Sequence, residues 1–240
     1  NYWSVGATKS VTINGKVGAT TISSLKVDAF IIGFNHNSSK EGSNRIHFLL
    51  GKISGKFVGL VDGNYGNSSS TSGAFTMNTS NTNSGGWESS QMRSKVLGSA
   101  SSPTSPTANT LLAALPSDLR AVMKSCTKYT DNKGGSNTAS NVSSTTDYLF
   151  LLSEYEVHGT RSYANSAEQN SQAQYDYFKA GNSKVANKHS ATGTAAVWWL
   201  RSPYYYTIYT SYYFCAVSSS GSLDYNNANY AYGVVPGFVV

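Results

Sequence analysis

The side chains that could do acid–base or nucleophilic chemistry are few and scattered along the 240-residue chain. The four histidines, His36, His47, His158 and His189, show no local partner pattern. The G-x-S-x-G, H-E-x-x-H and Walker A motifs and a G-x-G-x-x-G turn opening a helix do not occur. We therefore interpret the histidines as hydrogen-bonded or surface residues and expect the protein not to be an enzyme.

Glu154 and Glu156 are the one pair of carboxylates at a suggestive spacing, since they flank Tyr155. On a strand, both carboxylates would point to the same face. A glycan-acting enzyme could use such a pair, although glycosidase carboxylates normally come from separate elements. The other interpretation, which we favour, is a hydrogen-bonded or solvated structural pair.

Metal or cofactor binding is not predicted. The loop over residues 131–137 has oxygen ligands but lacks the alternating acidic spacing of a calcium loop, so an ordinary turn is expected. Cys126 and Cys215 allow one disulfide at most, and neither has the spacing of a metal site. We interpret them as two buried or incidental thiols.

Tyrosine is concentrated in one window, residues 204–232, which holds 9 of the 17 tyrosines. Five serines and three asparagines accompany them, and Asp224 is the one charged residue. Tyrosine with small polar residues is typical of antibody paratopes, and tyrosine rings also suit the faces of sugars. Exposed hairpins with no specific ligand would have the same composition, so the composition leaves both interpretations open.

The same window lacks Lys, Glu, Gln, Met and Trp, which make up 29 of the 211 residues outside it. On ordinary composition about four would be expected inside. An Asn codon randomised at its two adenines can encode Tyr, Ser, Asp, Thr or Gly, but none of the five missing types. The absence therefore indicates codons diversified at adenines and favours a ligand-binding face.

The remaining composition describes the class of protein. Ser, Thr and Asn supply 81 residues while only 12% are charged, against about 25% in ordinary soluble domains, which suits an exposed extracellular or virion surface. The net charge of +6 comes from scattered residues, so no nucleic-acid interface is predicted. No apolar stretch approaches the roughly 18 residues of a membrane span. The chain opens without a signal peptide or Met, so we expect it to be the C-terminal part of a longer protein.

The elements that must position the window follow from periodicity and turn residues. We expect a hairpin turn at Asn14-Gly15, a turn around Ser54-Gly55 and a polar loop over residues 67–86. Strands are expected over 10–13, 25–32, 45–53, 56–61, 126–130, 147–152 and 233–240, and helices over 87–97, 115–123 and 168–178. This order predicts one α+β domain, residues 1–240, whose terminal strands pair.

Together these residues resemble the variable proteins of diversity-generating retroelements, in particular the group from gut bacteria and their phages. The resemblance spans nearly the whole chain. It is most specific in Trp198-Trp199-Leu200-Arg201-Ser202-Pro203, the Tyr/Ser/Asn window and the closing Gly233-Val234-x-Pro236-x-Phe238. Further matches are Trp3-Ser4-Val5-Gly6, Ile32 to Asn37, Arg45 to Phe48, Gly85-Gly86-Trp87 with Met92-Arg93, and Leu115 to Met123. Many relatives have Arg where this chain has Val235.

The resemblance implies a C-type-lectin-like fold related to the formylglycine-generating enzymes. It also implies a non-enzymatic receptor-binding protein on a phage tail fibre, a tail tip or a bacterial surface. Its partners would be a bacterial surface receptor, protein or glycan, and a virion or cell-surface anchoring protein, with a homo-oligomer compatible with this role. A structural decoration protein of the virion is a third interpretation.

Mapped by the resemblance, two sets of residues are distinguished. The framework is expected to include Trp198, Trp199, Phe214, Val217, Gly221, Gly233 and Phe238. The predicted contact residues are Tyr204, Tyr205, Tyr206, Tyr209, Tyr212, Tyr213, Asp224, Tyr225, Asn226, Asn227, Asn229, Tyr230 and Tyr232.

Overall fold

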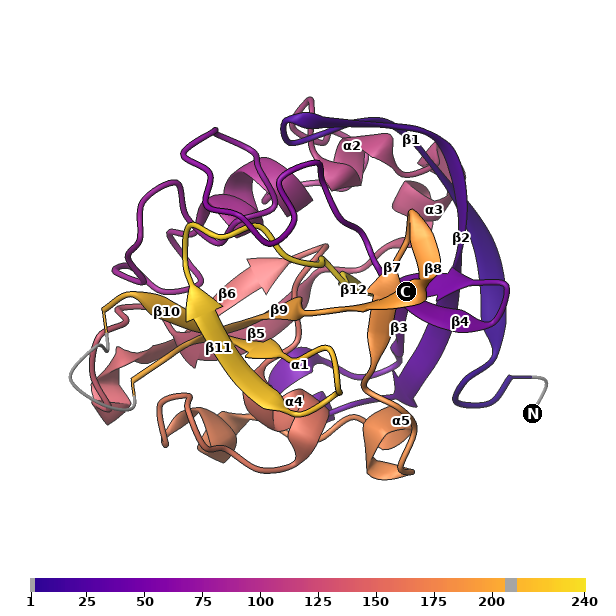
Figure 1. Ribbon diagram of the computed structural model, residues 1–240. Coiled ribbons are helices and arrows are strands. Elements are labelled where there is room, and N and C mark those ends of the chain that lie inside the picture. Colours follow the sequence, from indigo (N-terminus) through magenta and orange to yellow (C-terminus); the bar gives the residue numbers. More distant parts are fainter. Residues whose placement is uncertain (1–2, 206–210) are drawn as a thin grey trace.

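The computed structural model describes residues 3–205 and 211–240, so the predicted contacts Tyr206 and Tyr209 lie outside the described residues. The chain has a mixed α+β fold, made mostly of strands with a few short helices (Figure 1). The strands are β1 (Thr8–Val17), β2 (Thr20–Phe34), β3 (Ile46–Ile53), β4 (Lys56–Gly59), β5 (Cys126–Asp131), β6 (Val142–Asp147), β7 (Ala186–Lys188), β8 (Ala191–Ala196), β9 (Trp198–Pro203), β10 (Tyr213–Val217), β11 (Leu223–Asn227) and β12 (Gly237–Val239). The helices are α1 (Ser38–Glu41), the π-helix η1 (Met92–Leu97), α2 (Leu111–Ala114), α3 (Ser117–Val122), η2 (Ala139–Asn141), α4 (Glu154–His158), η3 (Glu168–Ser171) and α5 (Asp176–Lys179).

Three sheets organise these strands. The largest has the order β1-β2-β3-β4-β7-β8, with β12 also paired to β3, and it contains one parallel pair, β4 with β7. The second has the order β11-β10-β9, and Tyr213 and Tyr225 of the tyrosine window lie on its strands. The third is the β5–β6 hairpin. Figure 1 shows β1 and β2 on one side of the molecule and the β9–β11 sheet on the other.

The first hairpin does not turn at Asn14-Gly15, contrary to the prediction. The register between β1 and β2 shifts between Ile13 and Gly15, so this dipeptide lies at an irregularity inside β1. The strand continues because Val17 is fully buried and keeps pairing with β2. The turn comes at Gly18, which has φ +57° and lies too close to Gly73 for any side chain.

The terminal strands do not pair with each other, which corrects the predicted topology. β12 pairs antiparallel with β3, through Phe238 opposite Phe48, whereas β1 pairs with β2. β12 uses the same side of β3 as β4, but nearer the start of the strand. The first and last strands therefore share a sheet with two strands between them.

Several expected elements are shorter or differently placed. The prediction of a strand over 147–152 is wrong. The partner of β5 is β6, which ends at Asp147, and the buried residues 149–152 form only an isolated bridge at Phe150. Of the expected helix over 115–123, α3 remains, and Val122 is 57% exposed at its end. The helix expected over 168–178 is interrupted at Gln172, whose backbone is extended.

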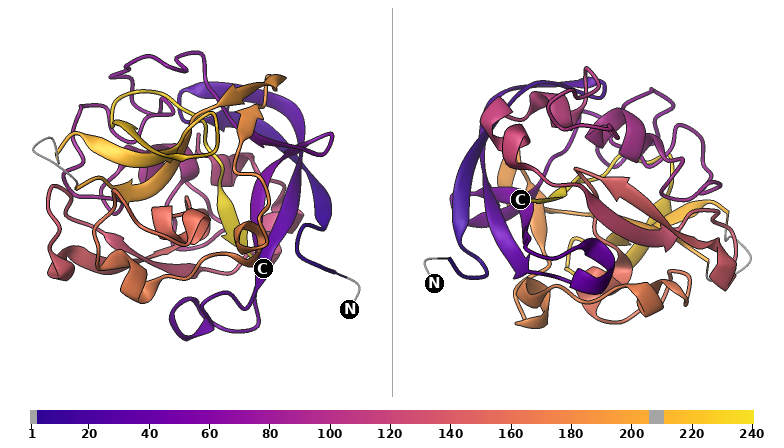
Figure 2. Two further views of the ribbon diagram at one scale, coloured as in Figure 1. Left: turned by 60° about the horizontal axis from the view of Figure 1, so that its bottom comes forward. Right: turned by 180° about the vertical axis from the view of Figure 1, so that it is seen from behind.

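Six of the seven residues predicted as the framework of the window are buried. Trp198, Trp199, Phe214 and Phe238 are buried in the main hydrophobic core. Val217 and Gly233 are also buried, and Gly221 is partly exposed. The two tryptophan N–H groups are satisfied by the carbonyls of Lys184 and Phe75. Figure 2 shows the sheet they belong to from two further sides.

None of the helices in the described ranges has the length and apolar character that a membrane crossing requires.

Candidate functional site

The tyrosine window is displayed by the β9–β11 sheet, of which β11 is an edge strand. Residues directly opposite in antiparallel strands share a face. Tyr213 lies opposite Asn227 and Cys215 opposite Tyr225, so Tyr213, Tyr225 and Asn227 point to one face. Asp224 and Asn226 point to the other. The predicted contact residues therefore occupy both faces of β11.

On the first face, four tyrosine rings form a tyrosine cluster, defined as Tyr163, Tyr204, Tyr213 and Tyr225. The ring of Tyr225 is central, with centroids 4.4 Å from Tyr204, 5.3 Å from Tyr213 and 5.0 Å from Tyr163. Tyr204 also meets Tyr213 edge to face at 5.5 Å. Aromatic pairs at these spacings are favourable beyond their buried area, so the rings hold one another in place.

Exposure divides the predicted contacts. Tyr212 and Tyr225 are 43% and 37% exposed. Tyr204 is only 2% exposed, because the other rings of the tyrosine cluster cover it. Tyr204 therefore supports the surface from below, and its predicted role as a direct contact is corrected. The other predicted contacts among the described residues are half-buried: Tyr205, Tyr213, Asp224, Asn226, Asn227, Asn229, Tyr230 and Tyr232.

On the second face, a smaller group of rings surrounds Tyr232. Its ring lies 5.3 Å from Trp199 and 5.6 Å from Tyr65, and it is stacked with Tyr230 at 6.4 Å. The ammonium of Lys188 lies 4.1 Å from the Tyr65 ring centre. Burial raises the pKa of both Tyr65 and Tyr232, so these phenols stay neutral at physiological pH.

The polar residues of β11 are held by local hydrogen bonds. The Asp224 carboxylate accepts from the backbone N–H of Tyr225 at 2.8 Å and from the side chain of Asn226 at 3.4 Å. Burial raises the pKa of Asp224. Asn227 accepts from the side chain of Asn81 at 2.8 Å, which ties the edge strand to the polar loop before η1.

The base of the segment between β9 and β10 is fixed by Asn83, a fully buried residue of the same polar loop. Its side-chain nitrogen donates to the carbonyl oxygens of Tyr204 at 3.0 Å and Tyr213 at 2.9 Å. Its backbone N–H donates to the carbonyl of Ser211. One asparagine thus holds both ends of the tyrosine-rich segment at a fixed separation.

The segment 161–164 packs beside the window and depends on Glu154. The Glu154 carboxylate accepts hydrogen bonds from three successive backbone N–H groups, those of Ser162, Tyr163 and Ala164, at 2.8–3.1 Å. Burial raises the pKa of Glu154, and these three donors oppose that effect. Glu154 is fully buried, so its role here is to shape a loop.

Glu156 belongs to a different buried network. It forms ion pairs with Arg201 and, at 3.0 Å, with Lys128, which also lies 2.8 Å from Glu41. Each of these side chains is at least 98% buried. Two carboxylates thus face two cations, so the network is neutral as it stands. Glu156 therefore has the hydrogen-bonded structural role that we favoured from the sequence, and its carboxylate does not pair with that of Glu154.

The same network contains the residue types that hold transition metals. Donor atoms of Glu41, His47 and Cys126 all lie within 4.8 Å of one another, as do those of His36, Glu41 and Glu156. Lys128 already supplies the positive charge at Glu41. Burial lowers the pKa of His36 to about 3 and of His47 to about 2, so both rings are neutral, and it raises the pKa of the Cys126 thiol to about 12.

The two cysteines are free and buried, as expected. In the loop after β5, the Asp131 carboxylate accepts from the backbone N–H groups of Lys133 and Gly134.

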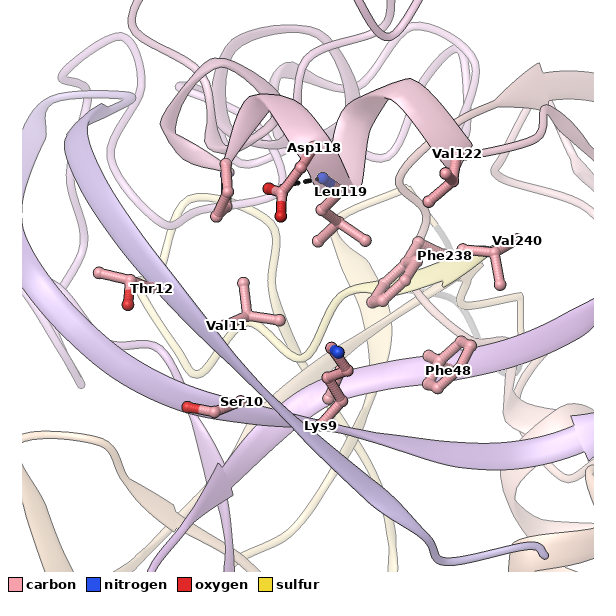
Figure 3. Close-up of a pocket in the computed structure, with 12 residues that line it drawn as sticks. Lys9, Ser10, Val11, Thr12, Phe48, Asp118, Leu119, Val122, Phe238 and Val240 are labelled. Atoms are coloured by element: carbon pink, nitrogen blue, oxygen red, sulfur yellow. Dashed lines mark hydrogen bonds between the residues drawn. The ribbon is translucent and has the colours of Figure 1, made fainter. Parts of the chain in front are cut away.

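A separate apolar groove of about 400 Å³ lies between β1 and α3 (Figure 3). The parallel rings of Phe48 and Phe238, 5.1 Å apart, line it together with Leu119 and Val122. Among the residues that the structure describes, no predicted contact residue lines this groove.

Four residues of the site lie outside the window and were missed from the sequence: Tyr65, Asn83, Arg161 and Tyr163. The tyrosines could have been noted as further aromatic residues. Nothing local distinguishes Asn83 or Arg161, because the tyrosines of the window that they contact lie more than 40 residues away in the chain.

A family model described as a domain of unknown function, DUF6273, matches residues 67–240. No curated protein and no solved structure matches the chain. The match covers the tyrosine window together with Asn83, Arg161 and Tyr163. It leaves out Tyr65 and β1 to β4, although β3 pairs with β12 inside the matched region.

Proposed function

Because the chain belongs to the DUF6273 family, whose description names no function, we propose a function from the geometry of its surface. The protein is a non-enzymatic receptor-binding protein, and the surface around β11 is its ligand-binding face. Its receptor is a protein or glycan on a bacterial cell. The protein is displayed on a phage tail or on a bacterial surface, where an anchoring protein holds it.

We further propose that the α+β fold is a C-type-lectin-like one, related to the formylglycine-generating enzymes. The sequence resemblance supports this proposal. The arrangement of buried Trp198 and Trp199 beneath a strand-borne tyrosine surface is consistent with it.

The observation that carries the proposal is the combination of exposed and locked tyrosines on one sheet. Tyr225 is 37% exposed, yet its ring contacts three other tyrosine rings. A ring that is already immobilised loses little side-chain entropy on binding, which is an advantage in any interface. The missing Lys, Glu, Gln, Met and Trp codons in the window add a second, independent reason.

The alternative of a glycan-acting enzyme has less support. Glu154 and Glu156 are both fully buried, and they belong to two different hydrogen-bond networks. An acid–base pair must reach the bond it cleaves.

The test is binding of fluorescently labelled protein to a panel of intact gut bacterial strains, read by flow cytometry. We expect the wild type to bind some strains and the triple variant Tyr205→Ala, Tyr212→Ala and Tyr225→Ala to lose binding by about tenfold or more. A tyrosine that is a hot spot of an interface contributes about 2 kcal/mol or more, so losing one such residue is enough for this effect.

The matched control is Phe34→Ala, since Phe34 is an aromatic residue outside the window with the same 37% exposure as Tyr225. It should bind like the wild type. Binding by the triple variant that equals that of the wild type would contradict the proposal. A homo-oligomer in solution whose interface buries the tyrosines would favour a structural decoration protein instead.

A further inference from the structure

Arg161 is placed at the edge of the tyrosine surface by the segment 161–164. This segment is joined to the window by a bridge between Ala164 and Tyr204 and by the Tyr205 N–H, which donates to the carbonyl of Tyr163 at 3.0 Å. Glu154 fixes it from below through three backbone N–H groups. The segment is therefore a rigid neighbour of the binding face, although it lies outside the window.

The Arg161 guanidinium is itself oriented. Its Nη1 donates to the carbonyl of Ala164 at 2.9 Å and to the Tyr205 hydroxyl at 2.7 Å, and its carbon lies 5.3 Å from the centre of the Tyr205 ring. Two hydrogen bonds and a ring contact leave this side chain little freedom. It loses correspondingly little entropy when it meets a ligand.

One end of that guanidinium has no partner. Nη2 makes no hydrogen bond to any residue in the described ranges, and it is not among the fully buried polar atoms, unlike Nε. Arg161 also has no carboxylate within ion-pair distance among those residues. The negative charge of the Glu154 carboxylate partly offsets the positive charge of Arg161. The carboxylate oxygens, however, accept hydrogen bonds from backbone N–H groups and none from Arg161 among the described residues.

We propose that Arg161 forms a subsite for a carboxylate group of the receptor and that Glu154 is the residue that positions it. This inference rests on the proposed receptor-binding function. An arginine held in place with a free N–H group is the standard partner of a carboxylate, and a charge-assisted hydrogen bond is about twice as strong as a neutral one. Two sources offer that group: Asp or Glu side chains of a surface protein, and acidic sugars.

The experiment uses a strain that the wild type binds. Arg161→Gln should weaken binding by about tenfold, because it removes the charge while the surrounding tyrosines remain. Arg161→Lys should recover only part of the loss, because Lys keeps the charge but not the planar fork. The matched control is Arg120→Gln, a half-buried arginine on α3 that bonds only backbone carbonyls, and it should bind normally.

Tyr205→Phe distinguishes the contribution of the Arg161 charge from that of the hydrogen bond that orients it. The variant removes the hydroxyl that accepts from Arg161 and leaves the guanidinium in place. It should lose less binding than Arg161→Gln. For the positioning role, Glu154→Gln should speed hydrogen exchange at the amides of residues 162–164 and weaken binding, with the fold retained. Exchange that stays as slow as in the wild type would overturn the role of Glu154.

Blocking carboxylates on the cells completes the test. Amidation with a carbodiimide and glycine ethyl ester should lower wild-type binding to the level of Arg161→Gln and leave Arg161→Gln unchanged. Protease and periodate treatments of the cells then assign the carboxylate to protein or to glycan. Unchanged wild-type binding after amidation, or full binding by Arg161→Gln, overturns the subsite alone. A wild type that binds no strain overturns the proposed function as well.

Discussion

Glu156 and Arg201 form a two-armed ion pair in which the Arg201 Nη1 and Nη2 atoms donate to the two carboxylate oxygens of Glu156, and both side chains are fully buried. Arg201 also donates to the Thr130 hydroxyl at 2.7 Å and to the carbonyl of Leu151 at 2.9 Å. One side chain of β9 therefore connects α4, β5 and the buried segment before α4. This connection fixes the strand that leads into the tyrosine window.

Replacing Arg201 by Met should destabilise the fold by about 3–5 kcal/mol, because the Glu156 carboxylate would stay buried without its main partner. The free energy of unfolding from urea titration is the measurement. Arg120→Met is the control, since it removes an arginine of α3 that forms no ion pair with any residue the structure describes, and it should cost about 1 kcal/mol or less. A loss below about 1 kcal/mol for Arg201→Met would show that the pair does not stabilise the structure.

Replacing Tyr204 by Ala should lower the free energy of unfolding much more than replacing Tyr225 by Ala, although the two rings are neighbours. Tyr204→Ala removes a ring that is 2% exposed and should cost about 3 kcal/mol or more, as expected for a buried aromatic residue. Tyr225→Ala removes a ring that is 37% exposed and should cost about 1 kcal/mol or less. Unfolding by urea measures both. Equal losses would contradict the division into support and surface.

Asn83→Ala should cost about 2 kcal/mol, because the carbonyl groups of Tyr204 and Tyr213 would lose a buried donor. Hydrogen exchange in residues 204–205 and 211–213 should quicken at the same time. Asn81→Ala is the matched control, since Asn81 is exposed and contacts the end of β11. The prediction fails if both asparagine variants behave alike.

Glu168 should make the stability depend on pH. Burial raises the pKa of its carboxyl from 4.5 to about 7 in the folded protein, so the folded state binds this proton more tightly than the unfolded chain. The stability it contributes is present below about pH 4.5 and is lost as the pH rises through about 7. Glu168→Gln removes this dependence.

The measurement is the difference in unfolding free energy between Glu168→Gln and the wild type at pH 5 and pH 8. That difference should move in favour of the variant at the higher pH. Because both proteins share all other titrating groups, including the buried histidines, their effects cancel. A difference that does not change with pH would show that Glu168 is ionised in both states.

Local sequence patterns predicted the structure correctly where it depends on the residues of a single turn or strand. The turn between β3 and β4 occurs at Ser54-Gly55, both with positive φ, as the dipeptide predicts. The same logic failed at Asn14-Gly15, because pairing with β2 and the burial of Val17 outweighed a good turn sequence. The helix predicted over 115–123 begins only at Ser117, because Leu115 precedes a proline and both Leu115 and Pro116 have extended backbones.

The sequence by itself determined that this protein is rich in hydroxyl and amide side chains, has few charged residues and contains a window of tyrosines free of Lys and Glu, since composition is a property of the chain. Only the tertiary structure decided which tyrosines are covered and which residues support them. Tyr204 is buried by Tyr163, and Asn83 holds Tyr204 from 121 residues away. Burial and hydrogen bonding across such distances depend on how the sheets pack, which no local pattern in the chain encodes.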